Sequence, residues 1–129
     1  MTSDDASPEQ PRGTGSPLVG GTFRVTAIQG VPTLAHPTAE LTFGDDGHLS
    51  GRATVNRIMG SYDTDRDTLV LSELATTMMA GLPDAMDQER RVLDALSRPL
   101  QVVALEGGDV ALDDGEDRTV LAPVTEELL

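Results

Sequence analysis

Carboxylates are the side chains of this sequence whose number and spacing first suggest chemistry. Asp63, Asp65 and Asp67 alternate in the way that the first ligands of an EF-hand calcium loop do. Counted from Asp63, however, the sixth loop position is Thr68 instead of glycine, and the twelfth is Leu74 instead of a bidentate acid. We therefore interpret the pattern as a solvated hairpin turn, with weak cation binding as the alternative.

A second acidic stretch, residues 106–117, contains six carboxylates in twelve residues. Two carboxylates that face each other across a cleft are the machinery of glycoside hydrolysis. Asp and Gly are also the common residues of turns between strands, and the acids of this chain fall in predicted turns, tails, strand ends and an exposed helix face. We expect the stretch to form turns, and an acid-dependent hydrolase is the alternative.

Other residue types with catalytic potential lack the partners that their chemistry needs. His36 and His48 are the two histidines, and their spacing matches neither a zinc motif nor a catalytic triad. The sequence contains no cysteine and no GxSxG motif, and no strand precedes the early glycines as a phosphate loop requires. We therefore expect a protein that is not an enzyme, with no catalytic residue, no metal site and no cofactor.

Methionines are the remaining candidates for a binding site, because their flexible side chains can line an adaptable apolar pocket. The four concerned are Met59, Met78, Met79 and Met86. With two Phe, one Tyr and no Trp in the chain, their use as filler in a collapsed core is the favoured interpretation. The alternative is a cavity for a small apolar, lipid-like ligand, and its predicted lining is Phe43, Met59, Met86, Leu93 and Leu96.

Charge and composition exclude further classes of function. The chain has 129 residues with a formal net charge of −13, and all nine of its basic residues are Arg. Such a field repels nucleic acids and anionic membranes. An acidic surface suits a basic partner, although a general compositional bias of the sequence is the favoured explanation of the negative charge. No stretch reaches the ~18 apolar residues of a spanning helix. Because neither a signal peptide nor a cysteine is present, we expect a cytoplasmic protein that is a monomer.

The elements that would position these residues follow from hydrophobic periodicity. Alternating apolar residues predict strands, and Gly- or Asp-rich turns separate them. The predicted strands cover residues 22–29, 39–43, 48–55, 58–62, 68–74, 100–105, 109–113 and 118–124. Residues 1–19 and 125–129 are predicted tails, which leaves one domain over residues 20–124, and residues 30–37 are a predicted loop.

One segment, residues 83–99, follows helical spacing instead. Its apolar face is predicted to consist of Ala85, Met86, Val92, Leu93 and Leu96. Pro83 suits a first helical turn, and Asp87–Arg91 and Asp94–Arg98 are i,i+4 pairs of favourable order. The sequence therefore predicts an α+β fold, in which one amphipathic helix packs on an antiparallel, partly closed, barrel-like sheet.

Three short motifs in this order resemble those of the META domain family, the family of HslJ-like heat-shock proteins. The first comprises Asn56, Arg57, Gly60 and Tyr62, the second comprises Thr76, Thr77 and Met79, and the third is the helix start "MDQE". The resemblance covers roughly residues 20–124. It implies no catalytic residue, and it implies links to heat stress, to the cell envelope and to antibiotic tolerance. The resulting expectation is a non-catalytic module that binds an unknown protein or an apolar small molecule in stress or envelope physiology.

The chain also departs from this family at defined positions. Members often carry Trp where Phe23 stands, Gly-Cys where this chain has Thr54-Val55, and a second Cys where Gly81 stands. The loss of both cysteines is what a cytosolic version would show. Within the motifs, we expect Asn56 to bond backbone groups, Gly60 to permit a bulge or a close approach, and Met79 to face the core or the helix.

Overall fold

The computed structural model describes residues 16–124, so the predicted tail at residues 125–129 and most of the one at residues 1–19 lie outside the described residues. In chain order, the elements are β2 (Thr22–Ile28), β3 (Val31–Pro32), β4 (Glu40–Phe43), β5 (His48–Arg52), β6 (Arg57–Asp65), β7 (Thr68–Thr76), α1 (Pro83–Leu96), β8 (Leu100–Ala104), the single-turn helix η1 (Glu106–Gly108), β9 (Val110–Asp113) and β10 (Arg118–Pro123).

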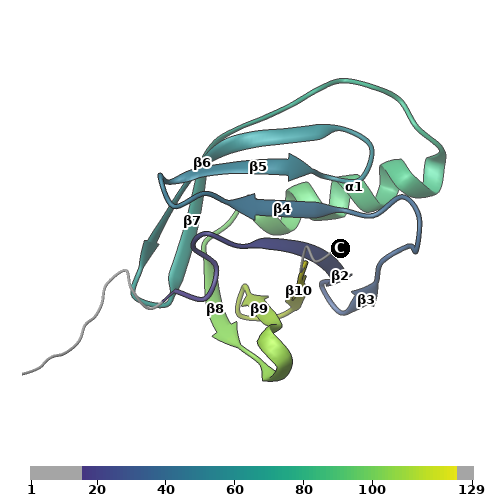
Figure 1. Cartoon of the computed structure of the whole chain (residues 1–129). Coiled ribbons are helices and arrows are strands. Elements are labelled where there is room, and N and C mark those ends of the chain that lie inside the picture. The colour runs from purple at the N-terminus through teal and green to yellow at the C-terminus, as the bar shows by residue number, and fades with distance from the viewer. Residues whose placement is uncertain (1–15, 125–129) are drawn as a thin grey trace, which may run out of the picture.

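The strands form one antiparallel sheet in the order β10-β9-β8-β7-β6-β5-β4-β2-β3, and β10 also pairs with β2. This last pairing, which places Leu121 opposite Val25, closes eight strands into a barrel and leaves the short β3 as an outer addition to β2. Figure 1 shows the strands curving into this barrel with α1 lying against it. The predicted α+β fold class is therefore confirmed. The sheet closes more completely than the sequence indicated.

Because neighbouring strands are antiparallel, their connections alternate between two ends of the barrel. The tight turns at residues 44–47 and 66–67 lie at one end, which we call the hairpin end. The connections at residues 29–30, 53–56 and 114–117 lie at the other end, which we call the helix end. Residues of α1 bond to Gln29 and Val55 there, and Arg98, which follows α1, pairs with Asp114. The helix thus covers one opening of the barrel.

The helix begins and ends where its sequence dictates. Pro83 occupies the first turn with Asp84 beside it. The two predicted i,i+4 ion pairs are both present, with Asp87–Arg91 at 3.7 Å and Asp94–Arg98 at 3.1 Å between nitrogen and oxygen. Among the described residues, no helix has the length and apolar character that crossing a lipid bilayer requires.

The three aromatic residues of the chain form a stack inside the barrel. Phe43 lies edge-on to Phe23 at 6.2 Å and edge-on to Tyr62 at 5.2 Å between ring centroids. The Tyr62 hydroxyl donates to the carbonyl oxygen of Gly44, and burial raises the pKa of this phenol above its usual value, with Asp45 and Asp46 adding to the shift. The stack therefore fills the hairpin end, and Val92, Ala95 and Leu96 of α1 belong to the same core.

Leu18 corrects the predicted domain boundary. The residue lies within the predicted tail, yet it is fully buried and belongs to the core. Its carbonyl oxygen accepts from the N–H of Gly21 at 3.0 Å, and Gly20 donates to the carbonyl oxygen of Phe43 at 2.6 Å. This packing could not be predicted from the sequence, because a single apolar pair among Pro, Gly and Ser has no periodicity. The domain therefore extends at least to Leu18.

Two glycines occupy positions that no larger residue fits. At Gly51, φ is +150°, and a Cβ atom would lie 2.1 Å from the carbonyl oxygen of Glu40. At Gly60, a Cβ atom would lie 2.7 Å from Leu74 Cδ2, and the pairing of β6 with β7 shifts register between Met59 and Ser61. The bulge and the close approach expected at Gly60 are both present.

Candidate functional site

The acidic turn between β9 and β10 is held by its own carboxylates. Asp113 Oδ1 accepts from the N–H of Gly115 at 2.8 Å. Asp114 Oδ1 accepts from the N–H groups of Glu116 and Asp117 at 2.9 and 2.8 Å. These bonds are the Asx-turn geometry in which a carboxylate replaces a backbone acceptor. The carboxylates therefore act on the backbone of the turn, as its composition predicted.

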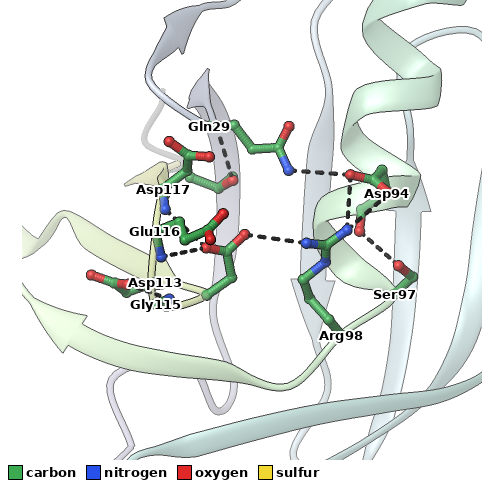
Figure 2. A network of polar contacts seen from close by, with 10 residues as sticks. Gln29, Asp94, Ser97, Arg98, Asp113, Gly115, Glu116 and Asp117 are labelled. Carbon is green, nitrogen blue, oxygen red and sulfur yellow. Dashed lines mark hydrogen bonds and ion pairs between the residues drawn. The ribbon is translucent and has the colours of Figure 1, made fainter.

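The same turn is tied to the C-terminal end of α1 (Figure 2). Arg98 lies between the two elements, 3.1 Å from Asp94 and 3.7 Å from Asp114. Gln29, from the turn after β2, donates to Asp94 Oδ2 at 3.2 Å. This network fastens the helix to two connections at the helix end.

Hydrogen bonding lowers the pKa values of Asp113 and Asp114 below their usual 3.8. For Asp114 the main cause is the two backbone N–H donors of Asp117 and Glu116, and Arg98 adds a smaller effect. For Asp113 the main cause is the N–H of Gly115, followed by Arg118, which lies 3.0 Å away. Both groups are ionised at neutral pH, so neither is a proton donor of the kind that a hydrolase needs.

We expect the turn to contribute to acid sensitivity. Because the folded-state pKa of Asp114 lies below its unfolded value of 3.8, its contribution is present above that pH and is lost as the pH falls through the folded pKa. Asp114→Asn keeps an oxygen that accepts both N–H bonds but no longer titrates. Thermal unfolding between about pH 6 and about pH 2 should therefore show a shallower acid limb for the variant than for the wild type. Equal steepness would mean that other carboxyls carry the acid sensitivity.

The remaining polar candidates stay apart from one another. Asp63 and Asp65 lie on β6, whereas Asp67 lies in the turn between β6 and β7. His48 lies at the hairpin end, where it pairs with Asp46 at 3.1 Å, and its hydrogen bond lowers the pKa of that carboxyl. His36 lies in the connection between β3 and β4, at the helix end. Within residues 16–124, no cluster of three or more His, Cys, Asp or Glu side chains is placed to hold a metal ion.

A buried polar network forms where α1 crosses the connection between β5 and β6. Glu89 is only 4% exposed. Its Oε1 accepts from the N–H groups of Val55 and Asn56 at 2.8 and 2.7 Å, and its Oε2 accepts from Asn56 Nδ2 at 2.7 Å. The neighbouring Gln88, also buried, accepts from the N–H of Leu34 at 2.7 Å and donates to Thr54 Oγ1 at 3.1 Å. These two side chains hold two connections of the helix end.

Asn56 is the centre of this network, because its amide uses all four of its hydrogen-bonding positions. Its Nδ2 donates to Glu89 Oε2 at 2.7 Å and to the carbonyl oxygen of Met79 at 3.0 Å. Its Oδ1 accepts from the N–H of Met79 at 2.6 Å and from Thr77 Oγ1 at 2.8 Å. The backbone bonds expected of Asn56 are therefore present. They join the segment after β7 to the helix.

Replacing Asn56 with alanine should lower the free energy of unfolding by about 1–3 kcal/mol, the cost of leaving buried partners unsatisfied. Chemical denaturation of the two proteins measures the difference. Ser61→Ala is a suitable control, because the Ser61 hydroxyl makes an exposed contact of 3.5 Å with Glu73. A variant as stable as the wild type would contradict the structural role.

Glu89 and Gln88 are the residues that the sequence reading missed. The acids of the helix were expected on its exposed face, and for Glu89 this is wrong. The available signal was spacing: Gln88 and Glu89 follow Ala85 by three and four residues and precede Val92 by four and three. They therefore share the buried face with Ala85, Val92, Ala95 and Leu96. They were not predicted to be buried because they are polar, and the sequence does not show which donors a buried carboxylate or amide would bind.

Three of the four methionines that were expected to fill the core lie on the surface instead. Met78 is 91% exposed, Met59 62% and Met79 60%. The expectation that Met79 faces the core or the helix is wrong, because β7 ends at Thr76 and Asn56 binds the Met79 backbone instead. Met59 points outward because its neighbour Ile58 points inward.

The other residues predicted to line a cavity are distributed differently. Phe43 and Leu96 are buried in the core, Leu93 packs against it, and Met86 is half-buried. Grooves of 220, 450, 340 and 310 Å³ lie on the outer surface, and none of these four contains any of the five predicted lining residues.

Residues 16–126 match the family described as the META domain. The chain belongs to the META domain family. No protein with a curated description matches the chain significantly. Among solved structures, the chain is similar to a protein from Burkholderia xenovorans solved by NMR, with 22% identity, 97% of each chain covered and a TM-score of 0.68. It is also similar to a DUF4847 family protein from Bacteroides vulgatus, with 15% identity, 85% of this chain and 96% of that chain covered, and a TM-score of 0.60. These likenesses show the fold alone.

The structure explains two departures of this META domain from the pattern that the family resemblance implies. Thr54 stands at the position of a common Gly, and its φ of +127° is one that glycine adopts more readily. Val55 and Gly81 stand at the positions of two cysteines, and a Cβ atom on Gly81 would lie 3.6 Å from Val55 Cβ. In this chain, the packing of Val55 against Gly81 occupies the place where two thiols would meet.

Proposed function

We propose that this META domain is a non-catalytic binding module, and that it engages a partner protein through exposed apolar side chains beside the helix end. One observation carries the proposal. Four large apolar side chains, which we call the methionine surface, are strongly exposed: Met59, Met78, Met79 and Leu82. Three of them, Met78, Met79 and Leu82, lie within five consecutive residues of the connection between β7 and α1, and exposed apolar patches often mark sites of interaction.

The backbone that presents the methionine surface is fixed. Asn56 bonds both the N–H and the carbonyl oxygen of Met79, and the N–H of Thr77 donates to the carbonyl oxygen of Arg57 at 3.1 Å. Methionine side chains adapt to different apolar partners at little cost, because they are unbranched and polarizable. A rigid backbone with adaptable side chains suits a recognition surface.

The charge of the chain indicates the chemistry of the partner. With a net charge of −13, the domain attracts a segment that combines Lys or Arg with apolar residues. The absence of catalysis is part of the proposal, supported by the engagement of Asp113, Asp114 and Glu89 with backbone donors. A role in stress or envelope physiology is part of the proposal and rests on the resemblance to HslJ-like proteins.

The test is affinity capture of a partner protein, followed by measurement of the dissociation constant with the purified partner. The triple variant Met78→Ser, Met79→Ser, Leu82→Ser should weaken binding of that partner at least about tenfold, since buried apolar anchors dominate such interfaces. Val70→Ser is the matched control, because Val70 is 45% exposed on β7 near the hairpin end. A partner bound equally well by the triple variant would contradict the proposal, and so would equal losses in both variants.

A further inference from the structure

Three arginines lie in one row across the outer face of the barrel. The register places Arg24 of β2 opposite Glu40 of β4, Glu40 opposite Arg52 of β5, and Arg52 opposite Arg57 of β6. Their inward neighbours Phe23, Leu41 and Ile58 are buried, so the row faces outward. We call Arg24, Arg52 and Arg57 the arginine row.

Among the described residues, four of the five other arginines have acidic partners, whereas the arginine row and Arg66 have none. Arg90, Arg91, Arg98 and Arg118 each pair with an aspartate. Within the part of the chain that the structure describes, none of the three guanidinium groups of the row has a carboxylate oxygen within 4.0 Å. In a chain with 22 acidic residues, three arginines in one row that form no ion pair within the described residues leave a local excess of positive charge.

The pairing of Arg52 with Arg57 is unfavourable by itself. Like charges directly opposite each other on neighbouring strands destabilise a sheet. Either residue would relieve this repulsion if it were neutral, and an anion between the two would turn the repulsion into attraction. Guanidinium groups suit that purpose, because their planar fork donates two parallel hydrogen bonds to a carboxylate or a phosphate.

A groove of 310 Å³ lies at this pair. Its lining residues are Glu40, Thr42, Ser50, Gly51, Arg52 and Arg57. The hydroxyl groups of Thr42 and Ser50 add hydrogen-bond donors beside the guanidinium groups. Gly51 has no side chain, so no side-chain atom of this residue occupies the groove.

Glu40 limits what the groove accepts. Its carboxylate lies between Arg24 and Arg52 in the register, and it repels an extended polyanion that would follow the whole row. The net charge of −13 opposes polyanions over longer distances. A ligand with one compact anionic group at Arg52 and Arg57 experiences less of both repulsions than a polyanion does, because it carries fewer charges and does not extend along the row past Glu40.

From these observations, we infer that the groove over β4, β5 and β6 is a binding site for a small molecule that carries a carboxylate or a phosphate group, held by Arg52 and Arg57. The groove adjoins Met59, which pairs with Ser50, but no residue of the methionine surface lines it. Its ligand is not the partner protein proposed above. Arg52 and Arg57 are the binding residues, and Thr42 and Ser50 supply further donors.

The test titrates the full chain with inorganic phosphate and, separately, with succinate, at an ionic strength held constant with sodium chloride. Constant ionic strength is needed because salt alone screens the repulsion within an acidic protein. Backbone amide NMR signals of Ser50, Arg52 and Arg57 should shift and saturate, and the titration that saturates identifies phosphate or carboxylate as the preferred group. No saturable shift with either anion, or saturable shifts only elsewhere in the chain, would overturn the inference.

Arg57→Ala should raise the dissociation constant at least about tenfold, since a charge-assisted bidentate contact is lost. The unfolding temperature of the ligand-free variant should equal or exceed that of the wild type, because the variant removes a like-charge pair. The saturating anion should then raise the unfolding temperature of the wild type and not of the variant. Arg90→Ala is the control, since Arg90 is exposed on α1 and pairs with Asp87. Unchanged affinity in Arg57→Ala, or an equal loss in Arg90→Ala, would overturn the inference.

Discussion

Replacing Glu89 with alanine is expected to lower the free energy of unfolding by about 3–5 kcal/mol, because three buried donors lose their acceptor at once. Two of these donors are the backbone N–H groups of Val55 and Asn56, and the third is Asn56 Nδ2. Glu89 is only 4% exposed, so water cannot readily take the place of its carboxylate as the acceptor for these donors. Denaturant unfolding at neutral pH measures the effect.

Glu89→Gln keeps the size of the side chain and one of its two acceptor oxygens, and it removes the charge and the other acceptor. One amide oxygen can still accept both backbone N–H groups, since both bonds go to Oε1. The amide nitrogen, however, would face Asn56 Nδ2, and Asn56 cannot turn over because its Oδ1 accepts from Met79 N–H. We expect a loss of about 1–3 kcal/mol, the cost of one unsatisfied buried contact.

Asp87→Ala provides the matched control on the same helix. Asp87 pairs with Arg90 and Arg91 on the exposed face, and exposed pairs contribute about 0–1 kcal/mol. If Glu89→Ala costs no more than Asp87→Ala, the network around Glu89 does not hold the helix to the barrel.

The double substitution Val55→Cys, Gly81→Cys should form a disulfide and raise the free energy of unfolding. The distance of 3.6 Å from Val55 Cβ to a Cβ on Gly81 lies within the ~3.5–4.5 Å of disulfides. The bond would close a loop of 27 residues, and the loop-entropy relation gives a stabilisation of about 3–4 kcal/mol. Mass spectrometry detects the bond, and urea unfolding with and without reductant measures its effect.

Gly81→Ala is the control for this prediction. Its added Cβ would lie 2.7 Å from Val55 Cγ2, so the single variant is overpacked and should lose about 1–3 kcal/mol. The double variant removes both methyl groups of Val55, so the clash disappears as the cross-link forms. An oxidised double variant with no gain over its reduced form would show that the two backbones do not lie as the structure places them.

Periodicity in the sequence was sufficient for much of the architecture. Alternating residues placed β2, β4 and β5 close to their observed positions, although β5 ends at Arg52 instead of Val55. The helical spacing of residues 83–99 placed α1 and both of its i,i+4 ion pairs. These features are local, because they depend on residues within a few positions of one another.

The motif residues could be recognised from the sequence, but the hydrogen-bonded network that they form together could not be predicted from it. Asn56, Thr77, Met79 and Glu89 are separated along the chain and meet in one hydrogen-bonded network. Their meeting depends on the bulge at Gly60 and on the path of the chain after Thr76. Neither property is encoded in the spacing of apolar residues.

The sequence by itself determined the fold class, eight of the nine described strands, the helix and the acidic character of this META domain, because each follows from local periodicity or composition. The exception is β3, which lies within the predicted loop at residues 30–37. Only the tertiary structure decided that Glu89 is buried, that Met78 and Met79 are exposed, and that Arg52 lies opposite Arg57. The reason is physical. A polar residue on an apolar face, or an apolar residue in a connection, takes its environment from segments distant in sequence. Those segments are brought alongside only when the barrel closes and the helix covers its end.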